Sequence, residues 1–263
     1  MSLSIAMVAL GERPHISGAA IVKDLAATWP SLPAASGMEQ KDGTLSFSVG
    51  RQTVILGLMP APIPWTDLEG PCATSWLWPK AAEELKKHRQ HLIVTVTSEG
   101  ATPIDRSKLL TQVVAAILAT CPQAIGVYWG NATLVVSKEM FRQFAVEMEM
   151  LPAGLPIPLW IDFRAGPGND GKMAGFTHGM EWLGHKELET LNAPESAGAL
   201  RERLMDLCGY LLQNGPVIQD GHTVGQSAQE KIRVVLSPSS FGHKGQVMRL
   251  DYSGVGKPWW KFW

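Results

Sequence analysis

Hydrophobic positions in the first part of the chain predict two kinds of element. Residues 3–10 form a short apolar run that is typical of a buried strand. Residues 15–30 carry apolar side chains at helical spacing, with Ser17 as the expected N-cap. Residues 44–50 alternate as a strand does, and residues 53–59 follow after a short polar break. That break predicts a β-hairpin between the two strands.

The next segment combines a proline-rich crossing with strongly apolar elements. Residues 60–64 (PAPIP) cannot donate a regular ladder of hydrogen bonds and are expected to be extended. The β-branched run 91–97 predicts a central strand, and Asp105 is expected to cap the helix that follows it. Apolar spacing further predicts helices at 73–88, 105–120 and 138–149 and strands at 124–129 and 132–136.

A second half is expected after residues 151–158 (LPAGLPIP), which contain three prolines and a glycine. This composition makes the segment the best candidate for a linker. Beyond it, residues 165–172 predict a loop and residues 195–213 predict an amphipathic helix. The strands expected in this half are 159–164, 173–178, 187–191, 216–220, 231–237 and 246–252.

Together these elements predict an α+β fold of mixed or antiparallel sheets, with helices packed on one face. Two α/β halves of similar size are expected, and a single continuous sheet is the alternative. No residue-level repeat relates the halves. The expected boundaries are 1–150 for the N-terminal subdomain, 151–158 for the connector, 159–256 for the C-terminal subdomain and 257–263 for an aromatic tail.

Composition and charge argue against several classes of protein. The chain has 263 residues, of which 18% are charged, with 23 basic and 24 acidic side chains. Nucleic-acid binding requires clustered Lys and Arg, and the densest basic run, 86–89, is better explained as a helix end. No apolar run is long enough to span a bilayer, and no signal peptide is recognisable. We therefore expect a cytoplasmic protein with no nucleic-acid partner, no transmembrane segment and no cofactor.

Several segments together are similar to a known bacterial family. They are PAPIPWTDLEG with the following WPKAAEELKKHRQHLIVTV, then AIGVYWGNATLVVS, and then GFTHGMEWLGHKELET followed by YLLQNG and VIQDGHTVG. On these residues the chain resembles the uncharacterised family catalogued as domain of unknown function 4261. The resemblance covers most of the chain and implies a bacterial, cytoplasmic, accessory-type protein. It implies no catalytic residue, because no activity is established for the family.

Histidines and a glutamate gather between two of the predicted strands. His178, Glu181 and His185, with His222 downstream, could offer imidazoles and a carboxylate to zinc. The spacing H-x-x-E-x-x-x-H matches neither H-E-x-x-H nor H-x-x-E-H, and two intervening glycines oppose a regular helix. The favoured interpretation is a turn that contains glycines, in which the histidines serve as hydrogen-bonding anchors. A metal or catalytic site is the alternative.

The segment 220–225 (DGHTVG) predicts a tight turn. Asp220 and His222 are two residues apart, so their side chains would share one face of an extended chain. Asp220 could then orient His222 as a base, although the turn remains the favoured interpretation. The serines form no G-x-S-x-G elbow, and the glycine-rich residues 165–171 lack the lysine of a P-loop.

Tryptophans and a C-terminal aromatic run are the candidate binding residues. Trp65 and Trp76 lie beside the proline-rich crossing and could line a groove for an apolar or extended ligand, although core burial is favoured. The aromatic residues that close the chain are Trp259, Trp260, Phe262 and Trp263. They would expose an apolar patch unless they dock. The alternatives are docking on the protein's own core, contact with a second chain, and insertion at a membrane interface.

The favoured function is a non-enzymatic binding or accessory protein, with bacterial immunity or secretion as a loose analogy. Its expected partner is another protein or a second copy of the chain, reached through the aromatic tail at 257–263. A metal-assisted hydrolase and a small-molecule binding module with a tryptophan-lined groove are the two alternatives. The preference rests on the expectation that the polar residues are too scattered to assemble a reaction centre.

Overall fold

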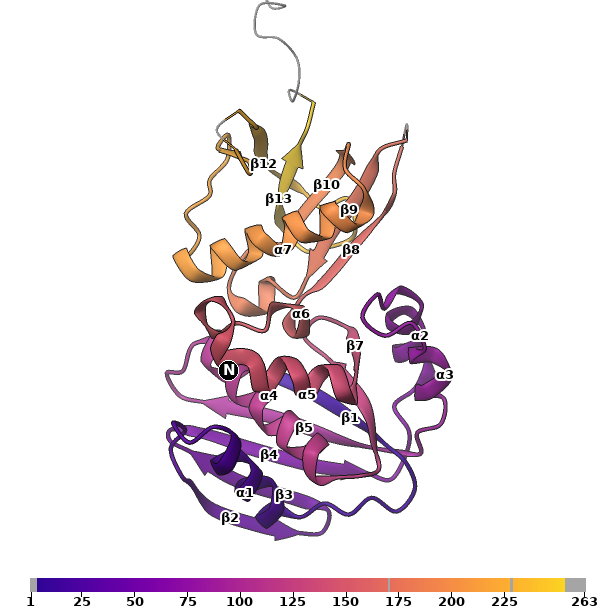
Figure 1. Cartoon of the computed structure of the whole chain (residues 1–263), viewed down its shortest axis with the longest axis vertical. Coiled ribbons are helices and arrows are strands. Elements are labelled where there is room, and N and C mark those ends of the chain that lie inside the picture. The colour runs from indigo at the N-terminus through magenta and orange to yellow at the C-terminus, as the bar shows by residue number, and fades with distance from the viewer. Residues whose placement is uncertain (1–3, 170, 228, 254–263) are drawn as a thin grey trace, which may run out of the picture. The chain divides into compact units, whose positions relative to one another are not determined.

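The computed structural model describes residues 4–169, 171–227 and 229–253, in two compact units (Figure 1). The first unit ends at Trp160, and the second begins at Ile161. Residues 151–158, the expected connector, lie in the first unit, which closes with η2 (Pro152–Gly154) and α6 (Ile157–Trp160). Within the described ranges, no helix is both long enough and apolar enough to cross a membrane.

An antiparallel seven-stranded sheet forms the framework of the first unit. Its strand order is β2-β3-β4-β5-β1-β6-β7, which places the β-branched strand β5 at the centre, as its sequence predicts. Val94 and Val96 of β5 are completely buried. The strands are β1 (Ser4–Leu10), β2 (Ala35–Lys41), β3 (Thr44–Val49), β4 (Gln52–Met59), β5 (Gln90–Ser98), β6 (Ala124–Trp129) and β7 (Leu134–Ser137).

Helices cover parts of both faces of this sheet. α4 packs on β1, β5 and β6, and α1 and α5 pack against α4 on the same face (Figure 1). Met7 and Ala9 of β1 join a cluster with α2 and α3, and alternation along the strand places that cluster on the opposite face. The helices are α1 (Gly18–Thr28), α2 (Trp65–Thr74), α3 (Ala81–Leu85), α4 (Pro103–Thr120), α5 (Lys138–Val146) and η1 (Glu147–Met150).

A mixed six-stranded sheet with the order β11-β12-β13-β10-β9-β8 forms the second unit. β10 and β13 run parallel, and the other pairs of described strands are antiparallel. α7 packs closely on β8 and β9, because Gly175 has no side chain to hold Leu200 away. The elements are β8 (Asp162–Pro167), β9 (Met173–His178), η3 (Glu181–Leu183), β10 (Leu188–Ala193), α7 (Ala197–Asn214), β11 (Thr223–Val224), β12 (Ile232–Pro238) and β13 (Gln246–Asp251).

The predicted α+β class with mixed and antiparallel sheets is confirmed. The two units have separate sheets, which excludes the single continuous sheet. Ser17 caps α1 as predicted, since its hydroxyl accepts a hydrogen bond from Ala20 N at 3.3 Å. The hairpin of β3 and β4 and the long helix α7 also lie where their hydrophobic patterns place them.

Two helix predictions are corrected. Within the helix expected over 73–88, only the last two residues of α2 and the short helix α3 are helical, because Pro79 follows a non-helical break and cannot continue a helix. The N-cap of α4 is Thr102 rather than Asp105. Thr102 Oγ1 accepts from Asp105 N at 3.1 Å, and the Asp105 carboxylate accepts from Thr102 N at 3.3 Å. The two residues form a capping box, so Asp105 belongs to the first helical turn.

Some strand predictions are wrong, because prolines or exposed polar residues at a sheet edge disturb the apolar pattern that identifies a strand. Residues 159–164 begin as the helical turn α6, which contains Pro158 in its first turn, before β8 starts. Residues 216–220 are irregular rather than a strand, and Pro216 removes one donor there. β2 escapes prediction because its side chains are mostly polar and exposed at the edge of the sheet.

Candidate metal centre

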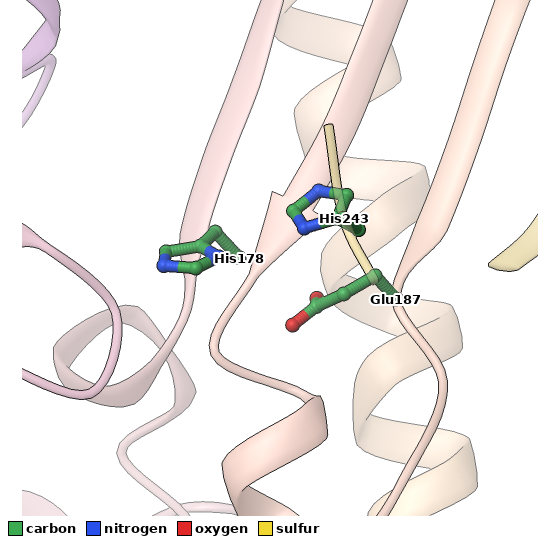
Figure 2. Close-up of side chains that lie close together, drawn as sticks. All are labelled: His178, Glu187 and His243. Carbon is green, nitrogen blue, oxygen red and sulfur yellow. The ribbon is translucent and has the colours of Figure 1, made fainter. Parts of the chain in front are cut away.

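Separate segments of the second unit bring two histidines and a glutamate together (Figure 2). His178 ends β9, Glu187 immediately precedes β10, and His243 lies in the loop between β12 and β13. One ring nitrogen of each histidine and one carboxylate oxygen lie within 4.8 Å of one another. Residues that are distant in sequence thus form a compact set of metal-ligating atoms.

The carboxylate of Glu187 is held by the turn that follows β9. This buried side chain accepts hydrogen bonds through Oε1 from Gly179 N at 2.8 Å and Glu181 N at 3.1 Å. Oε2 accepts from Thr177 Oγ1 at 2.7 Å, and that hydroxyl accepts from Leu188 N at 2.8 Å. Gly179 has a φ of 126°, which residues with a β-carbon rarely adopt. The glycine therefore lets the turn direct its N–H groups at the carboxylate.

The two imidazoles lie face to face beside this carboxylate. Their ring centroids are 5.5 Å apart, and their planes differ by 21°. Burial is the main cause that lowers the pKa of His178, and the negative charge of Glu187 partly opposes it. A lowered pKa favours the neutral ring, whose lone pair can bind a metal. Nε2 of His243 is buried and has no hydrogen-bond partner among the described residues, which a bound ion would explain.

Aromatic packing restrains the ring of His243. Phe176 stacks on Phe241 with ring centroids 4.6 Å apart, and it meets His243 edge-on at 5.5 Å. The guanidinium of Arg164 lies 5.8 Å from the Phe176 ring centroid. These contacts limit the rotation of the imidazole, so the ring is preorganised beside His178 and Glu187.

A cavity of about 600 Å³ adjoins the cluster. Glu187 and His243 line it together with Glu181, His185 and Asp220, three of the candidates from the sequence. An ion held by three protein ligands would therefore have room for a water molecule or a substrate atom as a further ligand. Such an open position distinguishes catalytic zinc sites from closed structural ones.

The donor set suits a small transition-metal ion. Zinc binds histidine nitrogen and carboxylate oxygen at about 2.0–2.2 Å, which places tetrahedral ligand atoms roughly 3.4 Å apart. Separations of up to 4.8 Å would have to shrink by up to about 1.4 Å, which side-chain rotations can provide. Two histidines and one carboxylate are also the ligand set of non-haem iron(II) sites. The residues present therefore fit zinc or iron better than magnesium or calcium, which prefer oxygen ligands.

The structure places His178 in the cluster and two of its predicted companions beside it. Glu181 donates its backbone N–H to Glu187 and exposes its side chain to the cavity. Burial lowers the pKa of His185, whose Nδ1 is buried with no hydrogen-bond partner in the described part of the chain. The expectation that polar residues are too scattered to assemble a reaction centre is therefore corrected, because these groups converge on one cavity.

Asp220 and His222 bond to the backbone rather than to each other. Asp220 Oδ1 accepts a hydrogen bond from Leu236 N at 2.8 Å. Nδ1 of His222, an exposed residue, accepts from Gln219 N at 3.3 Å. Gly221 between them has a φ of 80°, as a tight turn requires. These contacts support the turn interpretation and leave His222 outside the cluster.

Sequence reasoning misses Glu187 and His243, because neither stands at a metal-ligand spacing from another candidate. Glu187 opens a predicted strand, and His243 lies between glycines in an apparent turn (FGHKG). The parallel pairing of β10 with β13 brings their segments together. A prediction of which strands pair would have been the signal needed to find them.

The other predicted binding residues lie elsewhere. Trp65 is half-buried, and Lys86 Nζ lies 4.9 Å from its ring centroid. Trp76 is 38% exposed. The groove between these tryptophans stays a prediction. The tail residues fall outside the described part of the chain, and they are Trp259, Trp260, Phe262 and Trp263.

Comparison with family models gives a match over the region that contains the cluster. The model of Domain of unknown function (DUF4261) matches residues 176–251. This match confirms the resemblance for that segment, which includes His178, Glu187 and His243. Neither curated proteins nor solved structures provide a significant match to the chain. The matched family carries no assigned activity, so function has to be inferred from the geometry of the site.

Proposed function

We propose that the second unit binds one divalent transition-metal ion through His178, Glu187 and His243. The observation that carries this proposal is the convergence of three ligand atoms to within 4.8 Å of one another. The unpartnered Nε2 of His243 and the lowered pKa of His178 both support it. The two imidazoles favour zinc or iron(II) as the bound ion.

The adjoining cavity favours metal-assisted hydrolysis as the reaction class. Zinc lowers the pKa of a bound water to about 7, which supplies hydroxide at neutral pH. Glu187 and His243 belong to the cavity wall, so a water on the ion would face a space that admits substrate. This arrangement supports the hydrolase hypothesis over the non-enzymatic one. Its ligands differ from the expected set, because Glu187 and His243 replace Glu181, His185 and His222.

Metal titration of the full-length protein tests the proposal. The protein is stripped with a chelator, and Zn²⁺ binding is then measured by isothermal titration calorimetry. One equivalent is expected to bind, and His178→Ala is expected to lose it because one of three protein ligands is missing. His222→Ala is the matched control, since this exposed histidine lies outside the cluster. Unchanged zinc affinity in His178→Ala would contradict the proposal.

A second proposal is contact with another protein chain through the aromatic tail. Four of the five residues 259–263 are aromatic, and such a run would expose an apolar patch unless it docks on another surface. Deleting residues 258–263 is expected to lower the oligomeric mass measured by light scattering and to raise solubility. If both stay as in the full-length protein, the tail is not a contact between chains. With this contact we also propose a cytoplasmic location and, by loose analogy, an accessory role in bacterial immunity or secretion.

A further inference from the structure

A buried carboxylate next to the candidate metal centre holds the loop that carries His243. Glu189 of β10 is completely buried. Its Oε1 accepts a hydrogen bond from the Ser239 hydroxyl, and its Oε2 accepts one from Ser240 N at 2.9 Å. A buried carboxylate is costly unless such donors compensate it, so Glu189 and the start of the loop stabilise each other.

Ser239 connects Glu189 with His243. Its Oγ accepts hydrogen bonds from Phe241 N and His243 N, both at 3.0 Å. The hydroxyl thus donates once and accepts twice, which uses the full hydrogen-bonding capacity of a serine. The backbone of His243 is therefore fixed through two successive hydrogen bonds that end on Glu189.

Arg249 balances the charge of Glu189 and holds the same loop. Its Nη2 lies 3.7 Å from Glu189 Oε2 and donates to Pro238 O and Ser240 Oγ at 2.8 Å each. Glu189 and Arg249 are also register partners in the parallel pairing of β10 with β13. The loop is thus clamped to the strand pair that lies beside the cluster.

The segment that supplies Glu187 to the cluster also supplies Glu189. We propose that Glu189 is a positioning residue, which acts through Ser239 to hold the His243 imidazole against the metal position. This inference rests on the proposed metal-binding function, in which His243 is a ligand. Outer partners of this kind orient the ligands, and their loss typically weakens metal affinity about 10–100-fold.

Removing the Ser239 hydroxyl tests this role with little change in volume. Ser239→Ala and Glu189→Gln are each expected to weaken Zn²⁺ affinity about 10–100-fold, measured by competition with a chromophoric chelator. In the Co²⁺-loaded protein, the visible absorption spectrum of both variants is expected to differ from that of the wild type, because the His243 nitrogen is displaced from the ion. Ser237→Ala is the matched control, because the buried Ser237 Oγ has no hydrogen-bond partner in the described residues. This control is expected to leave both readouts unchanged.

The metal-free protein separates a failure of this inference from a failure of the metal proposal. In Ser239→Ala, the NMR resonances of the His243 ring are expected to shift, because the ring moves relative to Phe176. The resonances of His222, which lies outside the cluster, should stay in place. Wild-type protein that binds no Zn²⁺ would refute the metal proposal. If both Ser239→Ala and Glu189→Gln keep the wild-type Zn²⁺ affinity, cobalt spectrum and His243 resonances, the positioning role is refuted.

Discussion

Glu187→Leu is expected to lose metal binding and to lower the free energy of unfolding by about 3 kcal/mol. The carboxylate accepts hydrogen bonds from Thr177 Oγ1, Gly179 N and Glu181 N inside the protein. Leucine accepts none, and each buried donor without a partner costs about 1–3 kcal/mol. Urea denaturation of the full-length protein measures the stability, and Zn²⁺ titration measures the binding.

Glu181→Leu provides the control for this variant. The Glu181 side chain is exposed, and its contact with Glu187 is made by its backbone N–H, which the substitution keeps. Its stability is expected to stay within about 0.5 kcal/mol of the wild type. Equal stability of Glu187→Leu and Glu181→Leu would show that the turn after β9 does not depend on the buried carboxylate.

Arg203→Leu is expected to lower the free energy of unfolding by about 3 kcal/mol at neutral pH. The Arg203 side chain on α7 is only 9% exposed, and its Nη1 and Nη2 donate to both carboxylate oxygens of Glu230 at 3.0 and 2.8 Å. Its Nε donates to Glu195 at 2.7 Å, and Glu195 also accepts from Tyr252 OH at 2.8 Å. Leucine would leave two partly buried carboxylates without their shared cation.

The effect of Arg203→Leu is expected to depend on pH. A hydrogen bond from Gln226 N and the charge of Arg203 lower the pKa of Glu230. A lowered carboxylate pKa stabilises the fold above the ordinary glutamate pKa, and this contribution disappears as the pH falls through the lowered value. The stability difference from wild type should therefore shrink in acid. Arg51→Leu, at an exposed position, is the control, and a pH-independent difference would contradict the ion-pair explanation.

Local patterns predict most elements of this fold because their causes are local. β5 has β-branched residues on both faces, and α7 repeats leucines at helical spacing, so each pattern identifies its element. β2 fails the same test, because an exposed edge strand needs no apolar face. The helix predicted over 73–88 is reduced mainly to α3, because the effect of Pro79 on a helix outweighs the surrounding apolar spacing.

The site is less predictable than the elements, because its geometry depends on strand pairing. His178 and Glu181 are recognisable from their proximity in sequence, and both lie at or beside the cluster. Glu187 and His243 meet only because β10 lies next to β13. Hydrophobic periodicity shows that these strands exist, but it contains no information about which strand each one pairs with.

The parallel alignment of β10 with β13 brings His243 to Glu187 from a segment that is synthesised well after β10. α7, β11 and β12 separate the two strands in sequence, so His243 can reach Glu187 only after these segments have been synthesised. An ion bound by both His178 and His243 would hold together two segments that are far apart in sequence. It would stabilise the folded unit, because the unfolded chain has no preformed site for it. The supply of metal in the cell would then set how often the unit opens to proteases.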